Sequence, residues 1–434
     1  MRDDDISARP QPASRRPPRG GPAHALGLGL ISGAADDDPS AIGTYASAGA
    51  RFGPAFLWVA PAMLPMMYVV VYLCSKLGQV SGRGLFRVLH DSCPRWLLYP
   101  VLAGVLVGNT IEAGADLGGV GAALGMFVAA PIPLIVAVAG AGLYSLQVFG
   151  SYRLIRNVFR WLSLALLAYV GSGLLARPDL GAVLRATFAP HVELSRDFLG
   201  LLEAALGASL SAYLFSWQSN VEVEEEIAAG HTRLAQRQGA TRAELSRTRK
   251  DVLAGMVAAD LVLYFVVLAT ASTLYPAGHR NVRSAAAAAQ ALTPLAGPAA
   301  ALLFAAGIAG VGCLAVPVMT AGAAYDLLQT FGVKGTLNAR ARDAKLFYAT
   351  IAAFTAAAVG FNFLGLNPMK ALVLAGVVQG FSTPVLLALI VSMTSSRNIM
   401  GARVNGLGTR LLGWATTALA TAASVALVVS WAIG

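Results

Sequence analysis

The sequence has little charge for its length. Only 12% of its 434 residues are Asp, Glu, Lys or Arg, whereas 56% are hydrophobic and the mean hydropathy is +0.64. Soluble globular domains carry about 25% charged residues, so a chain this poor in charge would not cover a water-exposed surface. Its apolar residues form long blocks, which predicts an all-α polytopic membrane protein with helices of about 20 residues.

Cysteines and catalytic motifs are also scarce. Cys74, Cys93 and Cys313 have no metal-ligand spacing and are too few for a disulfide framework. The sequence contains no HExxH, no GxSxG and no phosphate-binding glycine loop. We therefore expect neither an enzyme nor a bound cofactor. The five histidines all fall in the N-terminal tail or in links between apolar blocks.

The charge that is present is mostly basic, with a formal net charge of +10. Basic charge can indicate nucleic acid, but here it lies in short links between apolar blocks, and no internal block is rich in both basic and aromatic residues. We therefore expect a lipid bilayer around the chain and no nucleic-acid partner. Nothing in the sequence implies an obligate protein partner.

Eleven apolar segments are long enough to cross a membrane. The chain before them, residues 1–24, is rich in Pro and Arg and is expected to be a disordered tail. The eleven segments lie at about 25–50, 54–76, 97–125, 131–149, 157–176, 198–226, 252–275, 298–329, 346–363, 368–394 and 411–432.

The distribution of Lys and Arg predicts the topology. With the N-terminus in the cytoplasm, 25 of the 32 basic residues fall in inner segments. This positive-inside bias predicts a multi-pass protein of the cell (plasma or inner) membrane, with a cytoplasmic N-terminus and an external C-terminus. The seven basic residues elsewhere are Arg51, Arg177, Arg185, Arg196, Arg280, Arg283 and Lys370.

Two of the segments are interrupted near their centres. In the first, thirteen residues (AHALGLGLISGAA) precede Asp36; as a helix they reach about 20 Å, short of the roughly 30 Å hydrocarbon core. Pro39 then removes a backbone donor. In the sixth, thirteen residues end at Leu210, and the polar run SAYLFSWQSN follows.

Interruptions in segments one and six predict two five-helix repeats of inverted topology, 25–176 and 198–394, followed by an extra helix in 395–434. In secondary transporters such breaks line the substrate site, because unwound backbone exposes carbonyls and helix ends to an ion. The chain is therefore expected to be a secondary transporter.

Carboxylates near the membrane centre are costly unless they are protonated or bind a cation. Consecutive helical residues point about 100° apart, so Asp36, Asp37 and Asp38 cannot all face one site. We expect Asp38, beside the proline, to be the main ligand of a transported metal ion, and Asp37 a second one. The alternative is that these acids only line a water-filled vestibule.

The third segment adds three polar side chains. Asn109, Glu112 and Asp116 are spaced by three and four residues, so they share one helix face. We expect them in the ion path; the alternative is a polar network between helices. In the sixth segment, Glu222 and Glu224–226 are expected to form a solvated helix end.

DDDPSAIGTYASAGA resembles the first-span motif of the NRAMP metal-ion transporters, usually Asp-Pro-Gly-Asn. Asp38 and Pro39 match, whereas Ser40 and Ala41 replace the Gly and Asn. The resemblance implies a LeuT-type 5+5 inverted repeat with divalent cations as substrate. It also places Gln379, a lone amide in the tenth segment, beside the metal.

The sixth segment departs from that family's Gly-Ala-x-x-Met-Pro-His stretch. Ser211 and Tyr213 stand at the Met and His positions. YLFSWQSNVEVEEE and NTIEAGADLGG are most similar to a divergent branch, the NRAMP-related magnesium transporters. Thioethers favour transition metals, whereas Ser211 offers a hard oxygen and Mg²⁺ keeps several waters in its sites.

The sequence therefore predicts transport of Mg²⁺, with Mn²⁺ as a second substrate, by alternating access around a midplane site that includes Ser211. The alternative is a proton-coupled Mn²⁺/Fe²⁺ transporter of the ordinary NRAMP kind, against which the missing Met and His count. A symporter of small organic substrates is a third possibility, but the three acids would repel a substrate carboxylate.

Overall fold

The fold is described from a computed structural model covering residues 27–149, 167–282, 284–333 and 335–433. The predicted tail, 1–24, and the start of the fifth predicted segment lie outside these residues. All regular structure in the described part of the chain is helical, which confirms the predicted class. Nine of these helical stretches are long and apolar enough to cross a membrane.

The helices follow the predicted segments closely. The first segment consists of two shorter helices, and the fifth is described only from Leu167 onward. The long helices are α1 (Leu28–Asp36), α2 (Pro39–Phe52), α3 (Val59–Ser81), α5 (Arg95–Leu124), α6 (Ile132–Phe149), α8 (Leu167–Leu175), α10 (Arg196–Ser209), α11 (Ala212–Ala228), α13 (Arg242–Thr273), α16 (Ala300–Thr330), α17 (Lys345–Phe361), α18 (Pro368–Ser395) and α20 (Leu407–Ile433).

Short helices occupy several of the links. None of them was predicted from the sequence, and α13 begins ten residues before its predicted segment. These short helices are α4 (Leu85–Ser92), α9 (Leu180–Phe188), α12 (Leu234–Arg237), α14 (Ala285–Ala289), α15 (Thr293–Ala296) and α19 (Arg397–Met400).

Both predicted helix breaks are present. Between α1 and α2, Asp38 adopts an extended conformation as the N-cap of α2, and its side chain accepts a hydrogen bond from the Ala41 amide. Pro39 occupies the first helical position, where its missing N–H costs nothing. The second break lies at Leu210 and Ser211, between α10 and α11. The prediction of broken helices one and six is confirmed.

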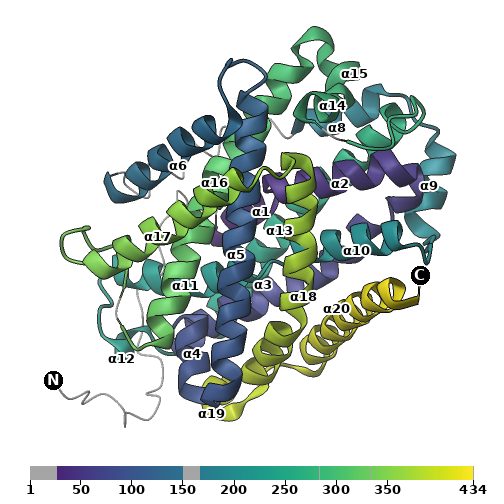
Figure 1. Ribbon diagram of the computed structural model, residues 1–434. Coiled ribbons are helices and arrows are strands. Elements are labelled where there is room, and N and C mark those ends of the chain that lie inside the picture. The colour runs from purple at the N-terminus through teal and green to yellow at the C-terminus, as the bar shows by residue number, and fades with distance from the viewer. Residues whose placement is uncertain (1–26, 150–166, 283, 334, 434) are drawn as a thin grey trace.

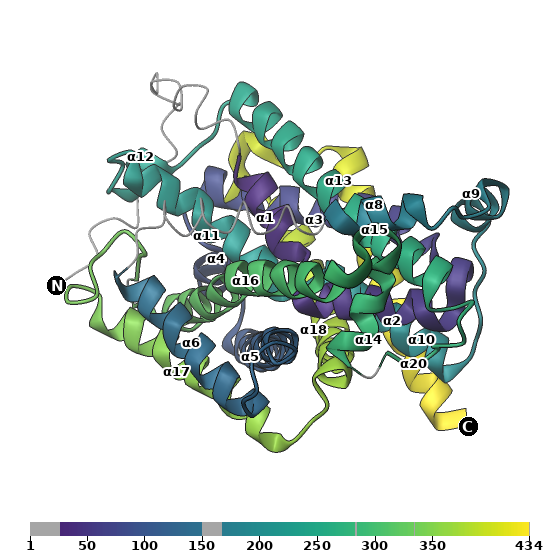
Figure 2. The ribbon, with the colours of Figure 1, turned by 90° about the horizontal axis from the view of Figure 1, so that it is seen from above.

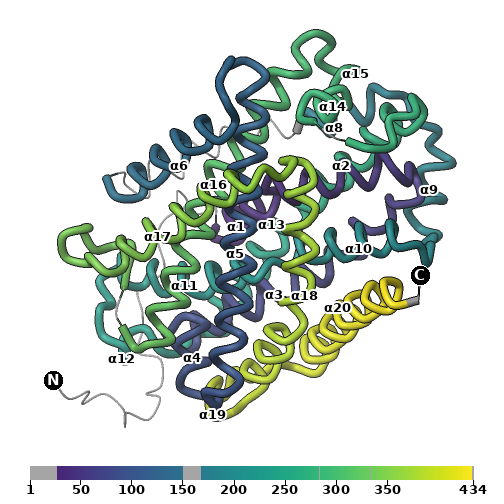
Figure 3. The backbone as a smooth tube through the Cα atoms, in the orientation of Figure 1, coloured from purple at the N-terminus to yellow at the C-terminus, as the bar shows by residue number. Residues whose placement is uncertain are grey.

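The helix α5 runs through the middle of the molecule (Figure 1). It packs against α16 and α18, and Figure 2 looks almost along its axis, with α16 and α18 on different sides of it. The backbone trace shows α2 and α10, one half of each broken helix, running side by side (Figure 3). The two breaks therefore lie on one side of α5, within reach of its polar face.

Glycines bring α10 into backbone contact with α18. A Cβ on Gly207 would lie 1.8 Å from the carbonyl oxygen of Gly376 and 2.4 Å from the amide nitrogen of Gly380. No side chain fits between the helices at Gly207, as is common where membrane helices associate through small residues. This contact places the second helix break directly beside the centre of α18, where Thr383 donates a 2.9 Å hydrogen bond to the Leu210 carbonyl.

Candidate functional site

Asp38 lies where the two helix breaks meet. Its side chain is fully buried, and Oδ1 accepts hydrogen bonds from the Ala41 amide and the Ser40 hydroxyl, both at 2.7 Å. Oδ2 accepts from the Tyr213 hydroxyl at 3.0 Å. Tyr213 lies on α11 and also reaches the Ala35 carbonyl at the end of α1, 2.8 Å away. One tyrosine therefore connects both sides of the first break to the second.

Glu112, on α5, joins three further elements. Its Oε1 accepts a 2.9 Å hydrogen bond from Ser211 at the second break and lies 3.4 Å from the Ser40 hydroxyl. Its Oε2 accepts a 2.6 Å hydrogen bond from the Gln379 amide on α18. The carboxylate is fully buried.

Asp116 and Asn109 flank Glu112 on the same face of α5. The Ser40 amide donates a 2.9 Å hydrogen bond to Oδ1 of Asp116, and the Gln379 amide nitrogen lies 3.0 Å from Oδ1 of Asn109. Asp116 Oδ2 and Asn109 Nδ2 are buried without a hydrogen-bond partner. Buried polar atoms are rarely left unsatisfied, so Asp116 Oδ2 is a candidate to contact a cation or its waters, whereas Asn109 Nδ2, a donor, could only donate to a water or another acceptor.

Six of the seven residues predicted as metal ligands thus share one hydrogen-bonded network: Asp38, Asn109, Glu112, Asp116, Ser211 and Gln379. The seventh, Asp37, is the C-cap of α1, and its buried Oδ1 has no hydrogen-bond partner. Both carboxylate oxygens of Asp36 are also buried and unpartnered. Asp260 on α13 lies within electrostatic range of these two acids.

Sequence reasoning missed the roles of Ser40 and Tyr213. Ser40 was noted only as a replacement for glycine, yet its amide and hydroxyl contact the carboxylates of Asp38, Glu112 and Asp116. Tyr213 was noted only as a lost histidine. Both residues carry a hydroxyl group next to a helix break, and this feature of the sequence could have identified them as hydrogen-bonding partners of the carboxylates.

The carboxylates do not converge on one point. Among the residues that the structure describes, no three His, Cys, Asp or Glu side chains are grouped closely enough to hold one metal ion. Hydroxyl and amide groups separate the acids instead. An ion bound here would therefore contact one or two carboxylates together with neutral oxygens, or with its own waters.

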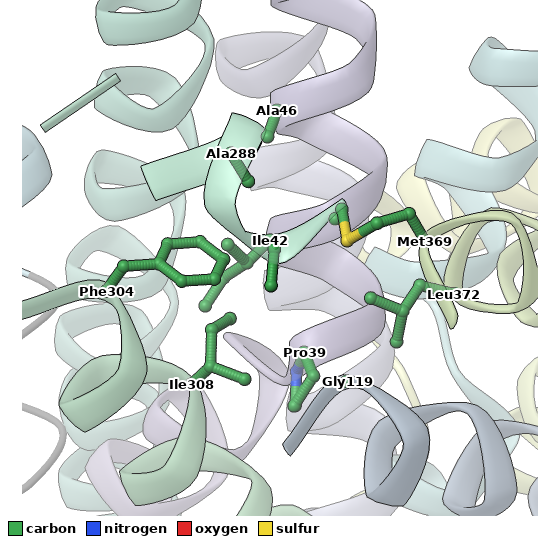
Figure 4. A pocket seen from close by; sticks show the side chains of 11 residues that line it. Pro39, Ile42, Ala46, Gly119, Ala288, Phe304, Ile308, Met369 and Leu372 are labelled. Atoms are coloured by element: carbon green, nitrogen blue, oxygen red, sulfur yellow. The ribbon is translucent and has the colours of Figure 1, made fainter. Parts of the chain in front are cut away.

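The site is closed to solvent on the side of α2. A cavity of about 10 Å³ lies next to Pro39, which is about the space of one water-sized sphere (Figure 4). Apolar side chains surround it, with Phe304 and Ile308 of α16 on one side and Met369 and Leu372 of α18 on the other. An ion can reach Asp38 from this side only after these helices separate.

Polar groups close the other side. Ser32 of α1 donates a hydrogen bond of 2.5 Å to Gln218 of α11, which in turn donates to Glu222 at 3.3 Å. Ser75 and Gln79 of α3 also donate to Glu222. A chain of hydrogen-bonding groups thus runs from α1 along α11.

The expectation of a solvated acidic helix end was wrong for part of α11. Glu222, Glu224 and Glu226 are at most 8% exposed. The carboxylate of Glu224 accepts hydrogen bonds from Tyr325 at 2.7 Å and from Thr336 and Asn338 at 2.6 Å. Tyr325 lies on α16, and the link after α16 supplies Thr336 and Asn338. The sequence of α11 by itself does not reveal these donors.

Known proteins match nearly the whole chain. The family described as "Natural resistance-associated macrophage protein-like" (Nramp) matches residues 29–430. A divalent metal cation transporter, MntH, of Deinococcus radiodurans is 28% identical over 400 residues, covering 90% of this chain and 86% of the relative. The MntH of Aeromonas hydrophila is 29% identical over 417 residues, covering 94% and 95%.

Solved structures show the same fold. The Eremococcus coleocola manganese transporter, in complex with an aromatic bis-isothiourea compound, superposes with a TM-score of 0.68 at 15% identity, covering 93% of this chain and 85% of that one. A nucleobase-cation-symport-1 family transporter gives a TM-score of 0.54 at 16% identity, covering 93% and 91%. The predicted LeuT-type architecture is therefore confirmed.

Proposed function

Because the chain belongs to the Nramp family, we propose that it is a multi-pass membrane transporter of divalent metal cations that works by alternating access around Asp38. The observation that carries this proposal is the burial of Asp38 at the meeting point of the two broken helices, next to Glu112 and Asp116. No basic side chain contributes a hydrogen bond to this network among the described residues, so a transported cation supplies the missing positive charge.

The hydroxyl groups around Asp38 fit this role. A hydroxyl donates one hydrogen bond and keeps two acceptor lone pairs. Ser40 and Tyr213 therefore orient the Asp38 carboxylate and still offer oxygen lone pairs to an ion. Ser211 does the same for Glu112. Each of these hydroxyl groups can contact the cation through a lone pair while it keeps donating to its carboxylate.

We further propose that Mg²⁺ is the main substrate, with Mn²⁺ as a companion. Hard cations prefer oxygen ligands, and Mg²⁺ keeps part of its hydration shell when bound. The side chains that hydrogen-bond to Asp38 and Glu112 come from serine, tyrosine and glutamine. A site with these small hydroxyl groups in place of a thioether suits a hydrated ion better than a soft one.

A proton-coupled transporter of Mn²⁺ or Fe²⁺ is the second candidate. It is favoured by the name of the structural relative, a manganese transporter, and by those of the curated relatives, which are divalent metal cation transporters. Glu112 and Asp116 are the groups available to carry a proton in that case, because both are buried beside Asp38.

Uptake of a metal series by proteoliposomes tests the proposal. Mg²⁺, Mn²⁺, Ca²⁺, Fe²⁺ and Cd²⁺ are each offered with and without a pH gradient, to vesicles holding wild-type protein or the Asp38→Asn variant. We expect Mg²⁺ and Mn²⁺ uptake by wild type in the absence of a pH gradient, and none by the variant. Uptake of Mn²⁺ or Fe²⁺ only with a pH gradient would favour the second candidate, and uptake of no divalent ion would refute both.

A further inference from the structure

A cavity of about 440 Å³ opens at the ends of α2, α10 and α18. Four basic side chains line it: Arg51 at the end of α2, Arg196 at the start of α10, Arg280 after α13, and Lys370 at the start of α18. Asp197 is its one acidic lining residue. These four are among the seven basic residues that the predicted topology places outside, so four of the seven exceptions to the positive-inside bias lie at one cavity.

Most of this positive charge is not neutralised. Arg51 pairs with Asp197. The Arg280 guanidinium stacks on the Tyr275 ring, 3.5 Å from its centroid, and donates to the Arg51 carbonyl at 3.3 Å. These contacts hold Arg280 in place without cancelling its charge.

Among the described residues, the charges of Arg196 and Lys370 are not neutralised by an acidic side chain either. Arg196 donates to the Ser430 carbonyl of α20 at 3.0 Å, which again leaves its charge in place. The Lys370 ammonium has no hydrogen bond or ion pair to any described residue. Four cations and one carboxylate leave a net charge of about +3 at this cavity. The resulting positive potential attracts anions.

The position of the cavity makes this charge unexpected. Ser47 and Met369 line it, and Met369 also lines the small apolar cavity beside Pro39. The basic cavity therefore lies on the side of α2 from which Asp38 is reached. A bare divalent cation approaching from there meets a repulsive field.

We propose that this cavity binds a phosphate-bearing organic anion. Guanidinium groups form paired hydrogen bonds with phosphate oxygens, and lysine adds a mobile point charge. Two long helices, α10 and α18, begin at the cavity, and helix N-termini favour anions. Its volume lies in the range of sites for small organic ligands, which is larger than inorganic phosphate requires. The phosphate comes either from a soluble ester or from a lipid headgroup.

The effect of the bound anion on metal transport rests on the proposed function. Its negative charge offsets the basic side chains, so a divalent cation approaches Asp38 without the repulsion. Binding of the anion itself does not depend on transport, and it can be measured without any metal.

Calorimetry on the purified full-length chain tests the binding. Glycerol phosphate is titrated into metal-free protein in detergent, with NaCl holding the ionic strength constant. We expect saturable binding at one site, weakened about tenfold by Lys370→Gln or Arg280→Gln, since each removes a charged contact. Arg185→Gln is the matched control: its guanidinium donates to Gly181 of its own helix α9 and does not line the cavity. It should bind as wild type does.

Lipid nanodiscs separate the two sources of phosphate. If the ligand is a lipid, phosphatidylglycerol raises the melting temperature of wild type over that in phosphatidylcholine alone and suppresses glycerol phosphate binding, and Lys370→Gln removes both effects. If the ligand is soluble, glycerol phosphate binds equally in both nanodiscs. Absence of binding from either source, or equal binding by wild type and Lys370→Gln, overturns the proposal. Asp38→Asn should bind glycerol phosphate normally, so failure of metal uptake and failure of anion binding are distinguishable.

Discussion

Ser211 donates a 2.9 Å hydrogen bond to Glu112 and thereby ties the second helix break to α5. The same hydroxyl lies 2.8 Å from the Gly207 carbonyl at the end of α10. The resemblance to the NRAMP sixth-span motif implies a methionine at this position. Here the position connects two helices through a hard oxygen.

Asp38 should be indispensable for transport. Replacing it with Asn or Ala removes the charge at the junction of the two breaks, and we expect divalent-ion uptake by proteoliposomes to fall to background. Asp36→Asn serves as the control, because Asp36 makes no hydrogen bond to the network, and its uptake should stay within a few-fold of wild type. Near-normal Mg²⁺ uptake by a well-folded Asp38→Ala protein would exclude Asp38 as the ligand.

Selectivity should change when soft and amide ligands are restored. The double variant Ala41→Asn/Ser211→Met places an amide next to Asp38 and a thioether next to Glu112, so we expect stronger Cd²⁺ binding and weaker Mg²⁺ transport. Calorimetry with both ions measures the shift. Ser211→Ala removes the bond to Glu112 without adding sulfur and should not increase Cd²⁺ affinity. An unchanged Mg²⁺/Cd²⁺ preference in the double variant means that ligand softness does not set selectivity.

Metal uptake should not be obligatorily coupled to protons. The four histidines among the described residues lie in α4 or in links, and Tyr213 is a phenol that stays protonated at neutral pH. A pH dye trapped in proteoliposomes held at a negative inside potential should report no acidification when Mg²⁺ or Mn²⁺ is added. Acidification that requires the metal and disappears in Glu112→Gln would contradict this and identify Glu112 as the proton carrier.

Gly207 should tolerate no larger residue. Its Cβ position overlaps the Gly376 carbonyl, so Gly207→Val forces α10 away from α18 and should cost about 2–3 kcal/mol or prevent folding. Thermal unfolding in detergent measures this. Gly104→Ala on α5 is the matched control, because no atom lies within 4 Å of its Cβ position. Equal melting temperatures for the two variants would show that the glycine contact is not needed.

Ser424 should stabilise a buried glutamate. Ser424 of α20 donates a 2.6 Å hydrogen bond to Glu203 of α10, whose other oxygen has no partner. Ser424→Ala leaves the carboxyl group without this donor and should lower stability by about 1–3 kcal/mol. Ser424→Ala in a Glu203→Leu background should cost much less, because no polar group is then left unsatisfied. An equal cost in both backgrounds would show that the bond contributes nothing.

Hydropathy was sufficient to predict the all-helical class, and the predicted apolar segments coincide closely with the main helices of the described residues. The helix breaks were also predictable, because Asp36–Pro39 and the polar run after Leu210 interrupt otherwise apolar segments. These are local signals: a proline lacks a backbone donor and a carboxylate is unusual in the hydrocarbon core, and both are visible without knowing the neighbouring helices. The repeat boundaries and the side of the membrane on which each terminus lies remain predictions of the sequence.

The partners of each polar group were decided only by the tertiary structure. Sequence spacing placed Asn109, Glu112 and Asp116 on one face of a helix. It did not reveal the glycine contact that brings Gln379 and Ser211 to that face. It also could not show that Arg51, Arg196, Arg280 and Lys370, spread over more than 300 residues, line one cavity. Hydropathy depends on the chemistry of each residue alone, whereas hydrogen bonds and cavities depend on how helices far apart in the sequence pack together.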